Sequence, residues 1–303
     1  MPAMGVDRVM GTPPGYRLGW LARLLTFSAH DPCARFLDGS LWWAARTPEG
    51  PGTLWLRPAP GQLLASGHGP GGSWLVERAD AVAGLRDRLD GFAALAASRP
   101  TLARLAGAVG TPRLPATGLV FQRLLRSVLE QKVTGTEAYR AYAATVRHFG
   151  EPAPGPVPLL LPPDPDAVAS AGYWVFHRFG VEQRRADTLA RAAAAAARLE
   201  RCGDSSETTA RLTAVDGIGR WTAAEVVRVV HGDADAVSVG DYHVKNTVSW
   251  ALAGEPRGTD ERMLELLAPF AGHRGRVCLL LEAAGLHAPR YGPRATIRSF
   301  HTY

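Results

Sequence analysis

A glycine turn and an aspartate are the residues of this 303-residue chain whose types and spacing could do chemistry. Gly217-Ile218-Gly219 separates two segments of helical pattern, so it forms a tight turn between two predicted helices. Backbone N–H groups at such a helix start bind a phosphate without needing a side chain. Asp241, about twenty residues later, stands immediately before another segment with helical apolar periodicity. Together these features favour a site that acts on DNA.

Helices must position both features, and the sequence predicts helices over most of the chain from Asp80 onward. In FQRLLRSVLEQKV the apolar residues recur at i, i+3, i+4, i+7 and i+8, which forms one face of a helix. The proline-rich segment 151–166 is an exception and predicts an extended loop. The predicted helices cover roughly residues 80–89, 92–107, 137–148, 260–268 and 274–284, as well as those on either side of the glycine turn.

The N-terminal third has a different pattern. Between about residues 36 and 80, short aromatic and aliphatic runs alternate with Pro/Gly clusters, which predicts strands in SLWWAART, GTLWLRPA, GQLLASG and GSWLVERA. The segment TPRLP, at residues 111–115, is a clear break. We therefore predict a mainly α protein with a disordered N-terminus at 1–15, a small α+β domain with an antiparallel sheet at 16–110 and an all-helical domain at 111–303.

Four tryptophans fall in the predicted strand region: Trp42, Trp43, Trp55 and Trp74. Such residues can form a surface on which nucleic-acid bases stack. More often they are the core of a sheet packed against a helix, and we interpret them so.

Composition agrees with a folded protein that has a polyanionic partner. Apolar residues make up 46% and charged residues 20% of the chain, and the net charge is +6. Of the 34 basic residues only Lys132 and Lys245 are lysines. Because arginine is used so generally, arginine counts indicate little here, whereas the two lysines stand beside the motifs described below.

Other classes of protein are disfavoured. The three cysteines lie far apart without a CxxC pair, which argues against a disulfide framework, an iron–sulfur cluster and structural zinc. The chain has no apolar run of the roughly 18 residues that span a membrane, and its start lacks the apolar core of a signal peptide. We expect a cytoplasmic protein.

The motifs together are similar to those of the helix–hairpin–helix (HhH-GPD) DNA glycosylase superfamily, closest to bacterial 3-methyladenine DNA glycosylase II. Three motifs carry the resemblance: VDGIGRWTA at 215–223, DYxVK at 241–245 and LxQ at 129–131. The order of a small β unit followed by a helical domain agrees with it. The resemblance covers roughly residues 114–281. In the N-terminal unit it rests only on the general pattern of short predicted strands.

The resemblance implies that Asp241 is the catalytic aspartate, which faces the deoxyribose of a nucleotide flipped out of the duplex. Cleavage of an N-glycosidic bond builds positive charge on the sugar, and a carboxylate stabilises that charge and orients water. An ordinary helix N-cap is the alternative role, and one aspartate can serve as both.

The position of Trp221 is a lysine in those family members that also cut the strand through a Schiff base. A tryptophan cannot form that imine, but it can stack on a flipped, positively charged alkylated purine. Tyr242 is a second candidate for the wall of the base pocket, with packing as the alternative for both aromatic residues. Glu225, one helical turn after Trp221, either alters base preference or points into solvent.

Several positions depart from the closest branch. Lys132 replaces a leucine wedge and could contact a phosphate or the orphan base, next to Gln131, which fills the gap in the duplex. His273 replaces a tryptophan beside the pocket. Asp216 replaces a proline, and its negative charge near a phosphate site is unexplained. These departures leave the preferred base open.

The remaining implied contacts are with the DNA backbone. They comprise the hairpin residues Gly217, Ile218, Gly219, Arg220 and Thr222, together with Lys245, Arg274 and Arg276. Carbonyl groups of Thr213, Val215 and Ile218 could hold a monovalent cation. The resemblance implies no cofactor and no catalytic metal.

The sequence thus predicts a monofunctional glycosylase that acts as a monomer on double-stranded DNA, excises 3-methyladenine-like purines and leaves an abasic site. One alternative is a glycosylase for deaminated or oxidised bases, with or without lyase activity. Another is a non-catalytic helix–hairpin–helix DNA-binding protein.

Overall fold

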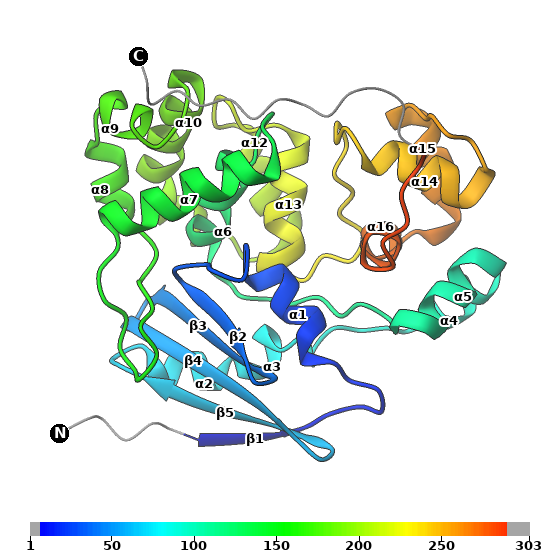
Figure 1. Cartoon of the computed structure of the whole chain (residues 1–303), viewed down its shortest axis with the longest axis horizontal. Coiled ribbons are helices and arrows are strands. Elements are labelled where there is room, and N and C mark those ends of the chain that lie inside the picture. The colour runs from blue at the N-terminus through cyan, green and yellow to red at the C-terminus, as the bar shows by residue number, and fades with distance from the viewer. Residues whose placement is uncertain (1–6, 290–303) are drawn as a thin grey trace.

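The structure, a computed structural model of the chain, describes residues 7–289. Five strands form one antiparallel sheet in the order β1-β5-β4-β3-β2 (Figure 1). This confirms the predicted antiparallel sheet in the N-terminal third of the chain. The strands are β1 (Asp7–Gly11), β2 (Ala34–Leu37), β3 (Ser40–Thr47), β4 (Gly50–Ala59) and β5 (Gln62–His68).

Two local predictions in this region were wrong. Residues 7–11, which we placed in a disordered N-terminus, form β1, because their backbone groups pair with the free edge of β5. The run GSWLVERA, predicted as a strand, forms helix α2 (Gly72–Glu77) and the start of α3 (Ala79–Val82). The buried residues of α2 are Gly72, Leu75 and Val76, whose i, i+3, i+4 spacing forms one helical face, and Leu75 and Val76 pack in the core of the N-terminal unit.

The tryptophans of the sheet are packing residues. Trp42 and Trp43 are neighbours on β3, so they point to opposite faces of the sheet, and both are buried. Trp43 packs with α1 (Leu18–Leu25), α2 and α3. Trp42 stacks on Trp55 at a ring-centroid distance of 4.4 Å and is covered by the proline-rich segment 151–166. Trp42 and Trp43 therefore form part of the core and not a base-stacking surface.

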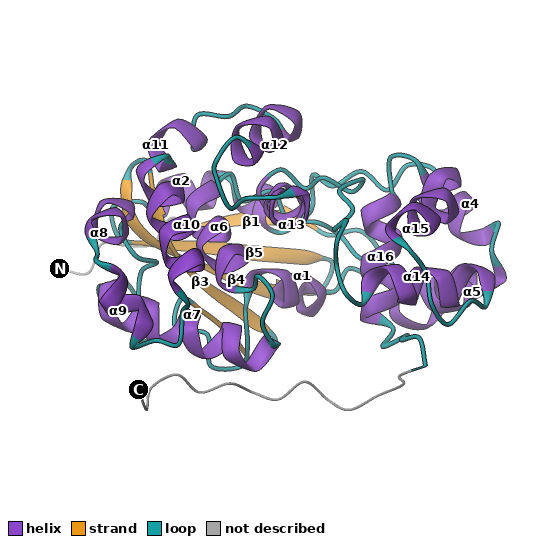
Figure 2. Ribbon diagram, turned by 90° about the horizontal axis from the view of Figure 1, so that it is seen from above, coloured by secondary structure: helices purple, strands orange, loops and turns teal. Residues whose placement is uncertain are grey.

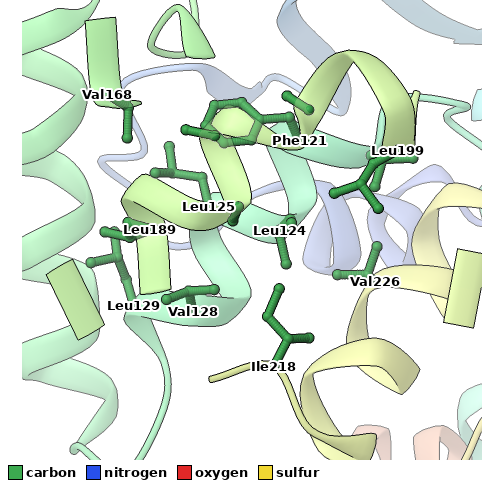
Figure 3. Packing of buried hydrophobic residues seen from close by; sticks show 14 of the residues in the cluster. Phe121, Leu124, Leu125, Val128, Leu129, Val168, Leu189, Leu199, Ile218 and Val226 are labelled. Atoms are coloured by element: carbon green, nitrogen blue, oxygen red, sulfur yellow. The ribbon is translucent and has the colours of Figure 1, made fainter. Parts of the chain in front are cut away.

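Apart from α1, α2 and α3, which pack on the sheet, the helices form two groups at opposite ends of the molecule (Figure 2). The larger group surrounds α6 (Val120–Leu129), whose apolar side chains interdigitate with residues of the surrounding helices (Figure 3). The other helices of this group are α7 (Gly135–Phe149), α8 (Pro165–Ser170), α9 (Tyr173–His177), α10 (Gln183–Ala194), α11 (Ala196–Leu199), α12 (Ser205–Thr213) and α13 (Arg220–Val230).

The smaller group combines segments from both ends of the chain. Helices α4 (Phe92–Ala97) and α5 (Pro100–Val109) share a core with the C-terminal helices, in which Phe92 and Leu102 pack with Met263 and Leu267. The predicted N-terminal domain, residues 16–110, includes α4 and α5, but their apolar residues pack with the C-terminal helices and not in the core of the sheet. The C-terminal helices are α14 (Val244–Ala253), α15 (Asp260–Leu267), the 3-10 helix η1 (Ala268–Phe270) and α16 (Arg274–Ala283).

Within residues 7–289, no helix is long and apolar enough to cross a membrane.

Candidate active site

The hairpin between α12 and α13 depends on its two glycines for different reasons. Gly217 has φ +91°, and a Cβ there would collide with the Thr188 side chain, so only glycine fits. At Gly219 a Cβ would meet no heavy atom of the described chain within 4 Å. Ile218, between them, is buried in the core around α6 and anchors the hairpin (Figure 3).

The start of α13 leaves backbone donors without helical partners. Gly219 caps the helix without a side chain, and the N–H of Ala223 bonds to the Gly219 carbonyl as the first bond of the helix. The preceding N–H groups of the first turn have no carbonyl within the helix. Gly219 and Arg220 are exposed. The hairpin therefore presents unpaired backbone donors at its surface, and the phosphate contact predicted there stays a prediction.

Gln131 braces the hairpin from the end of α6. Its Nε2 donates to the Gly217 carbonyl at 3.0 Å and to Thr222 Oγ1 at 2.9 Å. Thr222 is buried, so its side chain supports the hairpin, and its predicted contact with the DNA backbone stays a prediction. Lys132 follows Gln131 with φ +54° and is exposed. The left-handed backbone turns the chain here before α7 begins at its Thr134–Glu137 capping box.

Asp241 is held by three N–H donors. Its Oδ1 accepts hydrogen bonds from the backbone N–H groups of His243 at 2.7 Å and Val244 at 2.9 Å. Its Oδ2 accepts a bond from Nε1 of Trp221 at 3.0 Å. One oxygen of the aspartate therefore accepts the N–H groups at the start of α14, and the other is oriented by the tryptophan. Each carboxylate oxygen has more than one lone pair, so further bonds remain possible.

The two candidate pocket aromatics differ in exposure. Trp221 is half-buried and fixed by its bond to Asp241. Tyr242 is 78% exposed, and its ring meets His243 edge-on at a centroid distance of 4.9 Å. The packing role proposed as the alternative for Tyr242 therefore does not hold, because little of its ring contacts the protein.

Glu225 neither points into solvent nor is free to bind a base. Its carboxylate forms ion pairs with Arg123 at 2.8 Å and Arg228 at 3.0 Å, and it accepts a bond from the Ser238 hydroxyl at 2.5 Å. Burial alone would raise the pKa of this carboxyl, but the charges of Arg228 and Arg123 outweigh burial and lower the pKa to about 2. Glu225 is therefore a structural anion beneath Trp221.

His273 lies near the C-terminal end of α13, whereas the predicted base pocket includes Trp221 at the N-terminal end of that helix. It lines a pocket of about 420 Å³ together with His231, which follows the last residue of α13, while Trp221 is in the first turn. The length of α13 separates the two ends by about 15 Å. His273 donates from Nε2 to the Asp90 carbonyl at 3.1 Å. The sequence predicted that His273 lies beside the base pocket, but the packing of the chain places it next to Asp90 and His231.

Arg276 is not a DNA contact. Its side chain is fully buried and forms a bidentate ion pair with Asp87, at 2.6 and 2.7 Å, and a bond to the Pro112 carbonyl. Arg274 and Lys245 remain partly exposed, but both have acidic partners. Arg274 pairs with Asp235 through Nη2 at 2.5 Å, and Lys245 lies 3.8 Å from Asp260. Their predicted DNA contacts stay predictions.

The cation site predicted at three carbonyl groups also stays a prediction. The Val215 carbonyl accepts the Ile218 N–H at 3.0 Å, and Thr213 is exposed. Among residues 7–289 there is no group of three or more His, Cys, Asp or Glu side chains that could hold a metal ion.

Sequence reasoning missed Arg123 and Ser238 as parts of the site. The spacing of Trp221, Glu225 and Arg228 at i, i+4 and i+7 places them on one face of α13 and could have revealed the charge cluster. Arg123 was hidden by the abundance of arginine, and its partner Glu225 is 102 residues away.

Neither known family models nor curated proteins match this chain in sequence. Solved structures do match. A 3-methyladenine DNA glycosylase from Archaeoglobus fulgidus superposes with a TM-score of 0.76 at 18% identity, over 91% of this chain and 98% of that one. An 8-oxoguanine glycosylase/lyase from Clostridium acetobutylicum, bound to double-stranded DNA, gives 0.71 at 11% identity, over 93% and 97%. The chain has the fold of the helix–hairpin–helix DNA glycosylases.

A third structure with this fold covers less of the chain. The 3-methyladenine DNA glycosylase of Schizosaccharomyces pombe in complex with abasic DNA has a TM-score of 0.54 at 20% identity, over 65% of this chain and 97% of that one. The glycosylase fold therefore extends over nearly the whole of this chain, including the sheet, in the first two structures and over about two thirds of it in the third.

Proposed function

We propose that this protein is a DNA glycosylase of base excision repair, which hydrolyses the N-glycosidic bond of a damaged nucleotide flipped out of double-stranded DNA. The observation that carries the proposal is the bond between Trp221 and Asp241, close to the open N-terminus of α13. The likeness of the fold to known DNA glycosylases supports it.

Each part of the site has a task in this reaction. The free N–H groups of the hairpin and the first turn of α13 bind a phosphate of the DNA backbone. The Asp241 carboxylate faces the sugar and stabilises its positive charge while the bond from C1′ to the base nitrogen breaks. Water then attacks C1′ and releases a proton, which leaves an abasic sugar and a free base. Three fixed N–H donors keep the carboxylate oriented throughout.

We further propose that the preferred substrates are alkylated purines resembling 3-methyladenine. Such a base carries a positive charge, so it stacks favourably on an indole such as Trp221 and on the exposed Tyr242. It is also a good leaving group, and its departure needs no general acid beside Asp241. Because position 221 holds tryptophan and not an amine, base release proceeds without a covalent imine.

A second candidate function is excision of oxidised or deaminated bases. The observation that favours it is the likeness of the fold to an 8-oxoguanine glycosylase/lyase, with a TM-score of 0.71.

One experiment decides between these candidates. The protein is incubated with a panel of duplexes that carry methylated, deaminated or oxidised bases, and the released bases are identified by mass spectrometry. We expect release of methylated purines, and we expect Asp241→Asn to slow it by about a hundredfold or more. A variant that releases bases as fast as the wild type would refute the assignment of Asp241. Parallel reactions with borohydride report any lyase activity, which would appear as a trapped protein–DNA adduct.

A further inference from the structure

One face of α13 contacts the loop that carries Asp241 at two levels. Trp221, Glu225 and Arg228 recur at i, i+4 and i+7 on this face. At the first level the Trp221 indole donates to the Asp241 carboxylate. At the second level Glu225 and Arg228 contact Ser238, which lies three residues before Asp241 in the same loop. Helix α13 therefore contacts both Asp241 itself and Ser238, a residue of the loop that leads to it.

Four residues form the second level, which we call the Glu225 cluster: Arg123, Glu225, Arg228 and Ser238. Ser238 donates its hydroxyl proton to Glu225 Oε1 at 2.5 Å and accepts a bond from Arg228 Nη2 at 2.5 Å. Arg123 joins α6 to the cluster through its ion pair with Glu225 and a bond to the Glu225 carbonyl at 3.0 Å. Arg123, Arg228 and Ser238 are all buried.

The cluster reaches Asp241 through the backbone. The Asp241 N–H donates to the Ser238 carbonyl at 3.1 Å, so Ser238 and Asp241 form the two ends of one turn. The hydroxyl of Ser238 fixes one end of that turn to the ion pairs. The indole of Trp221 fixes the carboxylate at the other end.

We propose that Glu225 and Ser238 are positioning residues for Asp241. This inference rests on the proposed function, in which the Asp241 carboxylate must lie at a set distance from the sugar. Ion pairs in a buried, low-dielectric environment resist displacement more strongly than hydrogen bonds in water. The cluster therefore fixes the Ser238 turn relative to α6 and α13, and it keeps Asp241 Oδ2 within reach of the indole. A misplacement of about 1 Å at such a site lowers a rate about a hundredfold.

The sharpest test is Ser238→Ala, which removes the hydroxyl link and leaves the ion pairs intact. Ser127→Ala is the matched control, since Ser127 is also fully buried and its hydroxyl has no hydrogen-bond partner among the described residues. Under single-turnover conditions with methylated DNA, we expect Ser238→Ala to slow base release about tenfold. The affinity for DNA should stay within about twofold. The control should change neither quantity.

Glu225→Gln is a second variant that removes the charge and preserves the shape of the side chain. If it folds, we expect a loss of about a hundredfold in the same rate, because both arginines lose their counter-ion and the turn is released. If it does not fold, Ser238→Ala alone decides the question.

The position of Asp241 is also visible without activity. The indole N–H resonance of Trp221, identified by its loss in Trp221→Phe, reports the bond to Asp241 in the free protein. We expect this resonance to move in Ser238→Ala and to stay in place in Ser127→Ala. A purely structural contribution of Ser238 would lower the melting temperature and leave the resonance and the rate unchanged.

The outcomes separate this inference from the proposed function. If Asp241→Asn abolishes base release but Ser238→Ala leaves both rate and resonance unchanged, the positioning inference is wrong and the proposed function stands. If Asp241→Asn leaves base release unchanged, the catalytic role of Asp241 fails, whatever the resonance does. A shifted resonance together with a slower rate supports both.

Discussion

The two glycines of the hairpin, Gly217 and Gly219, are subject to different constraints. Gly217 is glycine because of the protein itself, since its φ of +91° and the Thr188 side chain exclude a Cβ. Gly219 has ordinary φ and open space around it, so the described chain gives no steric reason for glycine there. In the proposed function, the DNA phosphate that approaches this backbone closely would supply that reason.

Alanine at each position should separate the two requirements. We expect Gly217→Ala to lower the free energy of unfolding by about 1–3 kcal/mol, because the residue is strained and collides with Thr188. Gly219→Ala should change it by less than about 0.5 kcal/mol and weaken binding to duplex DNA. Urea unfolding and fluorescence anisotropy measure the two effects. Equal loss of stability in both variants would contradict this division.

At the scale of elements, the buried charges of the site join helices that are far apart in the sequence. Arg123 on α6 and Glu225 on α13 form an ion pair across the contact of the two helices. Arg228 on α13 reaches the loop before α14 through Ser238. A carboxylate between two buried arginines is costly to protonate. The free energy with which these helices pack therefore depends on pH.

Acid should therefore loosen this contact through Glu225. Its pKa is lowered from 4.5 to about 2, so its contribution to stability is present above pH 4.5 and is lost as the pH falls through about 2. We expect that contribution to amount to about 3 kcal/mol. The measurement is the difference in unfolding free energy between the wild type and Glu225→Gln at pH 5 and near pH 2. A difference that does not shrink in acid would refute the lowered pKa.

At the scale of the whole molecule, segments from both ends of the chain close one helical group. Helices α4 and α5 leave the N-terminal unit and pack on α14, α15 and α16. The ion pair between Arg276 on α16 and Asp87, in the segment before α4, fixes this closure from inside. Both side chains are nearly or fully buried, at 0% and 5% exposure.

Breaking this ion pair should affect stability and leave DNA binding intact. We expect Arg276→Met to lower the free energy of unfolding by about 3–5 kcal/mol, because the Asp87 carboxylate stays buried without its partner. The salt dependence of DNA affinity, measured by anisotropy on the folded fraction, should equal that of the wild type, since Arg276 contacts no phosphate. A shallower dependence on salt would restore Arg276 as a DNA contact. Arg220→Ala, at the exposed hairpin, is the comparison expected to reduce the dependence.

The sequence alone determined those features that depend on neighbours along the chain. The hairpin with its required glycine, Asp241 before a helix, the helical face of α6 and the strands between Pro/Gly clusters all follow from local spacing and backbone preference. The absence of an amine at Trp221 was also readable directly.

The tertiary structure alone decided which side chains meet. Arg276 and Arg220 are the same residue type, but one pairs with a carboxylate 189 residues away and the other is exposed. Glu225 meets Arg123 across 102 residues, and His273 joins the end of α13 opposite to Trp221. Such contacts are set by how the helices pack, because burial and long-range charge pairing depend on the whole core and not on local spacing.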